Sequence, residues 1–233
     1  MRKLILASLL AGGVLGLNAS AGTLAYQGNF DGINGLVNEV NSSAGVTAYT
    51  YDNFIVPVGQ TWDVTGLFSN NLSSVSWSSA FWDIRTGVSN GNGGTDVASG
   101  TGSATDIATG RSGFGYNEFQ AMVSGLNIQL TAGTYWLAVS PISSQFGESF
   151  ISTTSGAGGI NNDLSGKSYL ESAYFGANYE NSSDFLNPTP GFSEGVVGTL
   201  VTGSPEPASF LLIAGGLGLI GLARKRMTVK KDL

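Results

Sequence analysis

The middle of the chain is dominated by short stretches in which apolar and polar residues alternate. Residues 126–130 and 134–139 both place apolar side chains at every second position, and residues 131–133 between them read Thr-Ala-Gly. A period of two is typical of strands that bury one face, and the small residues favour a turn. We therefore expect a hairpin whose apolar residues face a common core, with Leu126, Ile128 and Leu130 on one strand and Tyr135, Leu137 and Val139 on the other.

The same alternation predicts further strands. Pro57 is expected to end one of them, with residues 58–60 forming a turn before the next. A change of apolar phase near Ser78 and Ser79 predicts a bulge or bend. In chain order, these strands are expected at residues 51–57, 61–64, 75–77, 81–85 and 195–201.

The composition supports an all-β body. The chain has 233 residues, of which 35 are glycine, and no long helical period is present away from its ends. Glycine supplies turn conformations that other residues reach only at a cost, and strands at short intervals with Gly-rich turns are typical of β-sandwiches. We expect residues 22–203 to form a β-sandwich of jelly-roll-like type.

Charge is distributed unevenly along the sequence. Between residues 22 and 204 there are fourteen acidic residues but only three basic ones, so this span has a net charge of −11; the basic residues are Arg85, Arg111 and Lys167. Such a surface repels phosphate backbones, so nucleic acid is not an expected partner.

The chain has neither histidine nor cysteine. This excludes the Ser-His-Asp and Cys-His nucleophile systems, His-based metal sites and thiolate zinc sites. Glycoside hydrolysis needs only two carboxyl groups and stays open, but the sequence singles out no such pair. We therefore expect no catalytic residues, no cofactor and no enzyme activity.

The N-terminus has the three parts of a secretory signal peptide. A basic start, Met1-Arg2-Lys3, precedes an apolar run at residues 4–17, and Ala19 and Ala21 supply an A-x-A cleavage pattern. The run is short for a membrane span. We expect residues 1–21 to be removed after Ala21; the alternative is a retained buried or membrane helix.

The C-terminus contains a second apolar segment, at residues 208–223, which is uncharged and 16 residues long. As a helix it would rise ~24 Å, slightly short of a typical hydrocarbon core, and flanking basic side chains can extend its reach. Arg224, Lys225 and Arg226 follow it and, by the positive-inside rule, keep this end in the cytoplasm. The body would then lie outside, as the signal peptide independently requires.

The tripeptide Pro205-Glu206-Pro207 precedes this segment. A Pro-Glu-Pro motif, a transmembrane helix and a short basic end, in this order, make residues 204–233 resemble the PEP-CTERM sorting domain. The resemblance implies recognition by an exosortase, a membrane enzyme thought to cut near the motif, in a Gram-negative bacterium that makes extracellular polysaccharide. Residues 227–233 extend beyond the usual end of such tails. A tail anchor that is never cut is the alternative.

Two polar, Gly-rich loops are expected at residues 89–96 and 155–163. The second leads into a candidate calcium site, because Asn161, Asp163 and Ser165 have the oxygen spacing of an EF-type loop start. The bidentate carboxylate of such a loop would fall on position 172, which is a serine. An ordinary turn stabilised by Asx side chains is the competing interpretation.

The four tryptophans are candidates for stacking against sugar rings, because aromatic faces pack on apolar C–H surfaces. All four fall in expected strands, where burial in the core is the ordinary fate. Trp136 is the outward candidate, since it is opposite in phase to Tyr135 and Leu137.

These features lead to one hypothesis with two alternatives. The chain is expected to be an exported cell-surface or matrix protein, transiently held in the inner membrane, with a structural or adhesive body and an exosortase as processing partner. The first alternative is a carbohydrate-binding module for extracellular polysaccharide, and the second is a polysaccharide hydrolase.

Overall fold

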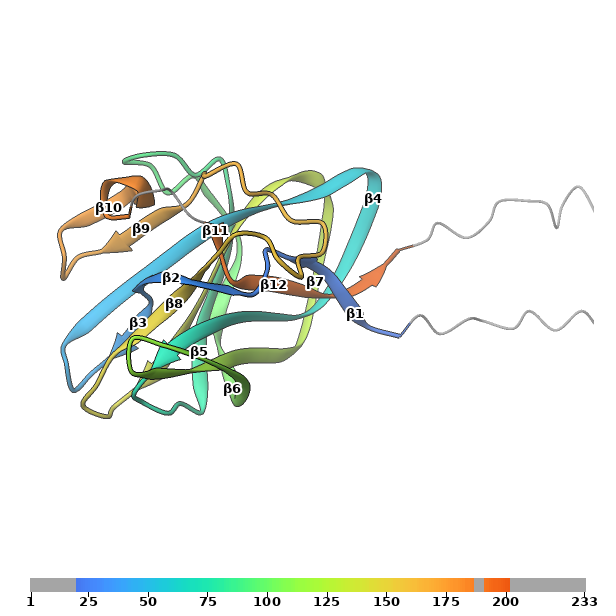
Figure 1. Cartoon of the computed structure of the whole chain (residues 1–233). Helices are drawn as coiled ribbons and strands as arrows, with labels where there is room; N and C mark the ends of the chain where they lie inside the picture. Colours follow the sequence, from blue (N-terminus) through green and yellow to red (C-terminus); the bar gives the residue numbers. More distant parts are fainter. Residues whose placement is uncertain (1–19, 187–190, 202–233) are drawn as a thin grey trace, which may run out of the picture.

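The computed structural model describes residues 20–186 and 191–201, and this part of the chain is all-β (Figure 1). Its helical content is one 3₁₀ turn, η1 (Ser182–Asp184), and no helix within the described residues is long and apolar enough to cross a membrane. The expected signal helix and the expected transmembrane helix at 208–223 lie outside the described residues. The predicted fold class is confirmed at the level of an all-β protein.

The described residues form twelve strands joined in one hydrogen-bonded network. The strands are β1 (Gly22–Tyr26), β2 (Phe30–Val37), β3 (Glu39–Asn41), β4 (Val46–Ser73), β5 (Ser79–Thr86), β6 (Thr95–Gly113), β7 (Tyr116–Ser143), β8 (Ser149–Thr154), β9 (Tyr169–Ser172), β10 (Ala177–Asn181), β11 (Gly191–Phe192) and β12 (Glu194–Leu200).

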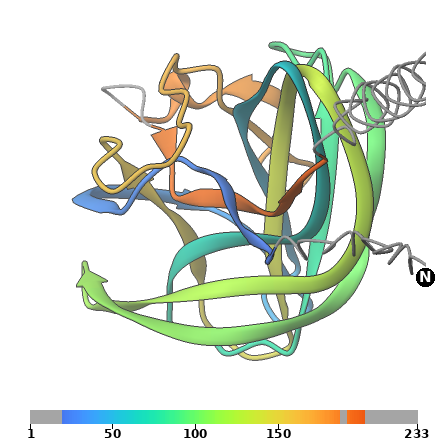
Figure 2. The same ribbon diagram turned by 90° about the vertical axis from the view of Figure 1, so that its right-hand side faces the viewer.

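The strands β4 and β7, each 28 residues long, form the centre of the network. They pair in antiparallel fashion from Asp52↔Leu137 to Ser73↔Asn117, with register shifts after Val56 and after Val64. Irregularities of this kind bend a strand and increase its twist. The two long strands therefore curve together around the core, as Figure 2 shows.

The main path through the network has the order β1-β12-β4-β3-β7-β5-β6, and the other five strands pair off this path: β8 and β9 pair with β4, β2 and β11 with β8, and β10 with β9. β12 pairs with β4, and β1 pairs with β12, so β1 lies at one end of the path. β6 lies at the other end and changes partner along its length: its first half pairs with β5, and the half from Ala104 to Gly113 pairs with β7. The β6–β7 hairpin reaches out at the lower left of Figure 2.

The expected hairpin at residues 131–133 is wrong. Residues 126–130 and 134–139 belong to the single strand β7 and do not pair with each other; both pair with β4, as Trp62↔Leu130 and Val56↔Gly133 illustrate. Opposite Ala132, β4 bulges outward at residues 57–60, and Val58 at its tip is 96% exposed. Pro57 thus marks a bulge inside one strand and not the end of a strand.

Other predicted strands are partly reproduced. Residues 81–85 lie in β5 and residues 195–200 lie in β12, whereas residues 75–77 lie outside the strands. The predicted core residues of β7 do face the interior: Leu130, Tyr135, Leu137 and Val139 belong to the main apolar cluster, and Leu126 and Ile128 pack against it.

The main cluster is organised by stacked aromatic rings. Phe54 lies between Trp62 and Tyr135, with ring centroids 6.1 and 5.6 Å apart respectively. Trp77 is buried in the same cluster and Trp82 packs against it, so both tryptophans have the core role expected for them, although Trp77 lies in the connection between β4 and β5. Aromatic pairs of this kind add about 0.5–1.5 kcal/mol beyond their buried area.

Two carboxyl groups are buried close to this core. Asp52 accepts hydrogen bonds from the backbone N–H groups of Asn53, at 2.9 Å, and Phe192, at 2.6 Å. Glu194 is buried as well, and its Oε2 has no hydrogen-bond partner among the described residues. Burial raises the pKa of Asp52 to about 8, although the two backbone hydrogen bonds act to lower it. Burial, together with the charge of the neighbouring Asp52, raises the pKa of Glu194 well above its usual range.

These two groups predict a stability that falls as the pH rises. Their ordinary pKa values are 3.8 and 4.5, so the folded chain holds protons that the unfolded chain has released. The stabilisation from Asp52 is complete below about pH 4 and is lost as the pH rises through about 8, and Glu194 acts in the same direction. Each proton contributes at most about 1.4 kcal/mol per pH unit. Urea unfolding between pH 5 and pH 8 measures this slope.

The variant Glu194→Gln should flatten the slope and raise the free energy of unfolding at pH 8, because the amide is never charged. Asp184→Asn, which changes an exposed carboxylate, is the matched control and should leave the slope as it is. A slope in Glu194→Gln equal to that of the wild type would contradict the assignment.

Candidate functional site

A polar cleft of about 350 Å³ opens between the end of β1 and the strands β4, β7 and β6. Its floor follows from strand register: Asn70 of β4 pairs with Gln120 of β7, which pairs with Ile107 of β6. Residues opposite each other in antiparallel strands have side chains on the same face. The cleft is therefore lined by side chains from four strands and one loop, including Tyr26, Asn29, Phe68, Asn70, Arg111 and Gln120.

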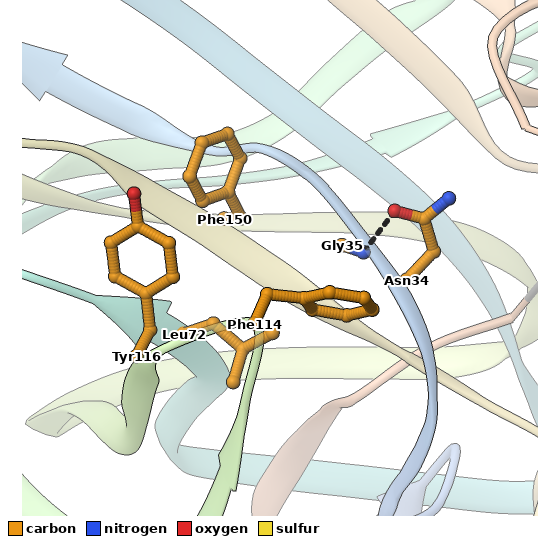
Figure 3. Close-up of a pocket in the computed structure, with 6 residues that line it drawn as sticks. All are labelled: Asn34, Gly35, Leu72, Phe114, Tyr116 and Phe150. Atoms are coloured by element: carbon orange, nitrogen blue, oxygen red, sulfur yellow. Dashed lines mark hydrogen bonds between the residues drawn. The ribbon is translucent and has the colours of Figure 1, made fainter.

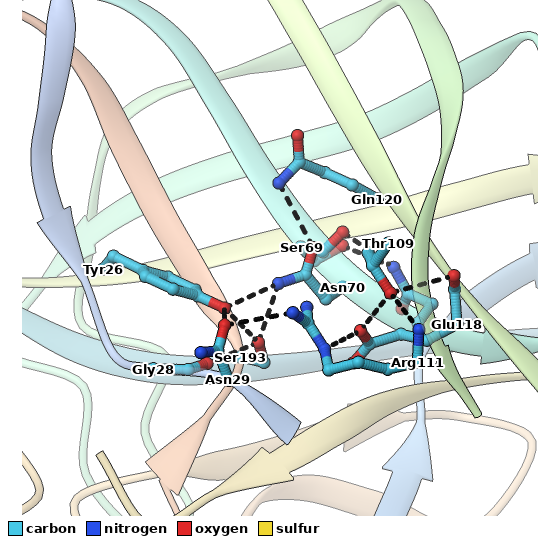
Figure 4. A network of polar contacts seen from close by, with 11 residues as sticks. Tyr26, Gly28, Asn29, Ser69, Asn70, Thr109, Arg111, Glu118, Gln120 and Ser193 are labelled. Atoms are coloured by element: carbon cyan, nitrogen blue, oxygen red, sulfur yellow. Dashed lines mark hydrogen bonds and ion pairs between the residues drawn. The ribbon is translucent and has the colours of Figure 1, made fainter. Parts of the chain in front are cut away.

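A chain of hydrogen bonds crosses the cleft (Figure 4). Gln120 Nε2 donates to Asn70 Oδ1 at 3.2 Å, and Asn70 Nδ2 donates to Tyr26 Oη at 3.1 Å and to Ser193 Oγ at 2.8 Å. Tyr26 Oη in turn donates to Asn29 Oδ1 at 3.0 Å. These bonds fix the orientation of the amide and phenol groups before any ligand arrives.

One wall of the cleft is an ion pair. Arg111 Nε lies 2.5 Å from Oε2 of Glu118, and Thr109 Oγ1 donates to the same oxygen at 2.6 Å. Arg111 Nη1 also donates to Asn29 Oδ1 at 3.1 Å. The Glu118 side chain is fully buried, while that of Arg111 is 31% exposed. Because a guanidinium has five N–H donors, Arg111 keeps donors beyond these two bonds for groups in the cleft.

A second pocket, of about 210 Å³, lies at the tip of the β6–β7 hairpin, and half of the residues that line it are aromatic (Figure 3). Phe114, Tyr116 and Phe150 line it together with Leu72, Asn34 and Gly35. The rings of Tyr116 and Phe150 meet edge to face with centroids 5.8 Å apart. Tyr116 Oη donates to Glu148 Oε2 at 2.8 Å, so one carboxylate lies at the rim.

The prediction that Trp136 faces outward is wrong. Its side chain is 7% exposed and packs in a separate cluster with Tyr51, Val88, Ala138 and Tyr169, and its Nε1 donates to the carbonyl of Lys167 at 2.8 Å. At this point β7 is covered on both faces: Tyr135 and Leu137 bury into the main cluster, and Trp136 buries on the opposite side. Trp136 therefore offers no open face to a sugar.

The calcium candidates have the geometry of an Asx turn. Asp163 Oδ1 accepts from the backbone N–H of Ser165 at 3.0 Å, and Asp163 Oδ2 accepts from Asn53 Nδ2 at 2.5 Å. Asn161 points elsewhere, because its Nδ2 donates to the carbonyl of Leu24 at 2.8 Å. In residues 20–186 and 191–201 no group of three or more acidic side chains could hold a metal ion. The three residues thus stabilise the loop.

The sorting residues Pro205, Glu206 and Pro207, the basic residues Arg224, Lys225 and Arg226, and Ala19 of the cleavage pattern lie outside the described residues. Ala21 is exposed and directly precedes β1, which begins at Gly22. The predicted cleavage position thus coincides with the start of the first strand.

Sequence reasoning missed both pockets. The residues of the cleft are up to 97 positions apart, from Thr23 to Gln120, and none stands in a recognisable motif. One local signal was available, since Arg111 is one of three basic residues in an acidic span. Neither a scan against models of known protein families nor a search of curated proteins finds a match for this chain.

The ion pair predicts an asymmetric response to mutation. Arg111→Ala strands the buried Glu118 carboxylate and should lower the free energy of unfolding by about 3 kcal/mol, the low end for a buried pair because the guanidinium is partly exposed. Glu118→Gln leaves a partly solvated guanidinium and should cost about 1 kcal/mol. Urea unfolding of both variants measures the difference.

The double variant Arg111→Ala/Glu118→Gln is the control, since it combines the two single variants and removes the charge of both partners. It should be more stable than Arg111→Ala alone, with a coupling energy of about 1 kcal/mol or more. Additive losses in the double variant would show that the two side chains do not interact energetically.

Proposed function

We propose that this chain is an exported protein of the cell surface or extracellular matrix of a Gram-negative bacterium, with an adhesive role. In this proposal the β-body attaches to extracellular polysaccharide through the polar cleft. The observation that carries it is the pair of planar groups of Gln120 and Arg111 beside the ring of Tyr26, which the buried Asn70 and Glu118 hold in place. Amide and guanidinium groups pair with vicinal hydroxyls, and an aromatic ring packs against the apolar face of a sugar.

Packing around the cleft supports a preformed binding surface. The Tyr26 ring leans on Phe68 with centroids 5.4 Å apart, and its hydroxyl bonds with Asn29 and Asn70. The site is therefore held by buried neighbours and little side-chain ordering is needed on binding, which favours affinity. A purely structural role would not require such an arrangement. Binding is proposed in preference to hydrolysis, because hydrolysis needs two carboxyl groups at the scissile bond and the described residues that line the cleft include no Asp or Glu.

Export and sorting are proposed from the two ends of the sequence. Residues 1–21 serve as the signal peptide, residues 22–203 as a β-sandwich of jelly-roll-like type, and residues 204–233 as a PEP-CTERM tail processed by an exosortase. Before processing, residues 208–223 hold the chain in the inner membrane. The pairing of β1 with β12, with Gly22 opposite Gly198, supports this arrangement, because the first and the last strand of the body, which are next to the two end segments in sequence, lie side by side (Figure 1).

The binding proposal predicts that the full chain is retained on immobilised neutral polysaccharide and that Gln120→Ala weakens retention about tenfold, the equivalent of about 1.4 kcal/mol for a lost hydrogen-bonding group. Gln129→Ala is the matched control: it lies on the same strand, is exposed, and bonds with Asp63 outside the cleft. Affinity electrophoresis in gels containing the polysaccharide measures retention. Equal losses in both variants, or no retention on any neutral or anionic polysaccharide, would contradict the proposal.

The sorting proposal predicts a mature chain that begins at Gly22 and ends near Pro205–Pro207. Mass spectrometry of the intact protein and its terminal peptides, recovered from membrane and medium of the native host, tests both ends. Glu206→Ala should leave the full tail in the membrane fraction if the motif directs processing. A wild-type chain that always extends to Leu233 would identify the tail as a permanent anchor.

A further inference from the structure

We infer that the polar cleft and the aromatic pocket are two subsites of one groove that holds a linear, uncharged polysaccharide. This inference rests on the proposed glycan-binding function and adds to it the extent of the site and the class of glycan. The cleft supplies hydrogen-bonding groups, and the pocket supplies aromatic faces. A single sugar would occupy one of them, whereas a chain would occupy both.

The two pockets are adjacent along two separate segments. In β6 and its turn, Arg111 lines the cleft and Phe114 lines the pocket, three residues further on, a span of about 10 Å for extended chain. In the facing segment, Asn29 lines the cleft and Asn34 lines the pocket. Both segments thus run from one pocket to the other, which defines the direction of the groove.

Phe30 joins the two pockets. Its ring lies against the backbone of Gly113, where a Cβ atom would come within 2.6 Å of the ring, and its centroid is 6.5 Å from that of Phe114. Glycine at position 113 is therefore needed for this close approach. The contact ties the β6–β7 hairpin to the start of β2 and provides an apolar ridge that a sugar chain would cross.

Phe114 has a backbone conformation that is unfavourable for a residue with a bulky side chain. Its φ is +54°, in the left-handed region where glycine is usual, and its side chain is 63% exposed. A large apolar side chain at an exposed, strained position is a feature that points to binding. Phe114, Phe30 and Tyr116 would form the stacking surface for sugar rings beyond the cleft.

The charges of the groove favour an uncharged glycan. The guanidinium of Arg111 is already paired with Glu118, so the cleft has no surplus positive charge to attract a uronate. Glu148 lies at the rim of the pocket through its bond with Tyr116. Asp31 accepts from Thr153 Oγ1 at 2.7 Å, and the same oxygen accepts from the backbone N–H of Asn34 at 3.1 Å. These carboxylates would repel an anionic chain and can accept hydrogen bonds from hydroxyls.

The test is calorimetric titration of the full chain, solubilised in a detergent without a sugar headgroup, with cello-, xylo- and manno-oligosaccharides of two to six units. For at least one series, affinity should rise at least tenfold between the disaccharide and the hexasaccharide. Oligogalacturonates of the same lengths should bind at least tenfold more weakly than that neutral series. Equal or tighter binding of the oligogalacturonates would overturn the assignment to an uncharged glycan.

Phe114→Gly gives the decisive comparison, because it changes binding and folding in opposite directions. Loss of the ring should remove the gain in affinity with length, whereas relief of the positive φ should raise the urea midpoint of unfolding. Phe146→Ala is the matched control, since Phe146 is 88% exposed and does not line either pocket. It should leave the gain in affinity with length unchanged.

The outcomes separate this inference from the function on which it rests. If Phe114→Gly keeps the full length dependence while Gln120→Ala weakens binding at every length, the two-subsite groove is wrong and glycan binding by the cleft stands. If the wild type binds none of the neutral or anionic oligosaccharides, the glycan-binding function fails and the groove fails with it.

Discussion

Two 28-residue strands, β4 and β7, pair with each other along most of their length, and the other strands are arranged around this pair. The pairing is antiparallel and long-range, joining positions 44 to 85 residues apart in the sequence. Where the register shifts, the strands bend, so the same pair contributes to more than one face of the core. The aromatic stack of Phe54, Trp62 and Tyr135 joins residues on both sides of the first register shift, at the bulge of residues 57–60.

A buried polar network reinforces the pairing. Asn38 donates to Asn71 Oδ1 at 3.0 Å and to the carbonyl of Val139 at 2.8 Å, and Ser69 Oγ donates to the same carbonyl at 2.6 Å. Ser140 Oγ donates to Asn38 Oδ1 at 2.5 Å. Satisfied polar groups of this kind cost little to bury and specify one register, because a slip would leave them unpaired. The register that they support also brings Asn70 opposite Gln120 in the cleft.

The sequence predicted those properties that depend on local patterns. Alternation and glycine content indicated an all-β chain, the inward side of β7 from Leu130 to Val139, and the positions of β5 and β12. It did not predict which segments pair. The stretches on either side of residues 131–133 fit a hairpin as well as they fit one strand lying along β4, and the difference lies in contacts with residues far away in the sequence.

The candidate site was unpredictable for a related reason. The alternation of apolar residues correctly assigned Trp136 and its neighbours to opposite faces of β7. Alternation does not show whether the second face is covered by other residues, and here Tyr51 and Tyr169 cover it. The cleft gathers residues from β1, β4, β6 and β7, which register and not sequence brings together. Nothing in the sequence around Phe114 marks it as a binding residue. It became a candidate because its φ is positive and because Phe30 lies against the neighbouring Gly113.

The proposed glycan lies on the face formed by β4, β7 and β6. The most direct measurement is a crystal structure of the protein in complex with a neutral hexasaccharide. The expected result is sugar density that runs from the cleft beside Tyr26 and Gln120, over Phe30, to the ring of Phe114. Density located elsewhere on the body, for example at the loop of residues 89–94, with both pockets unchanged, would contradict it.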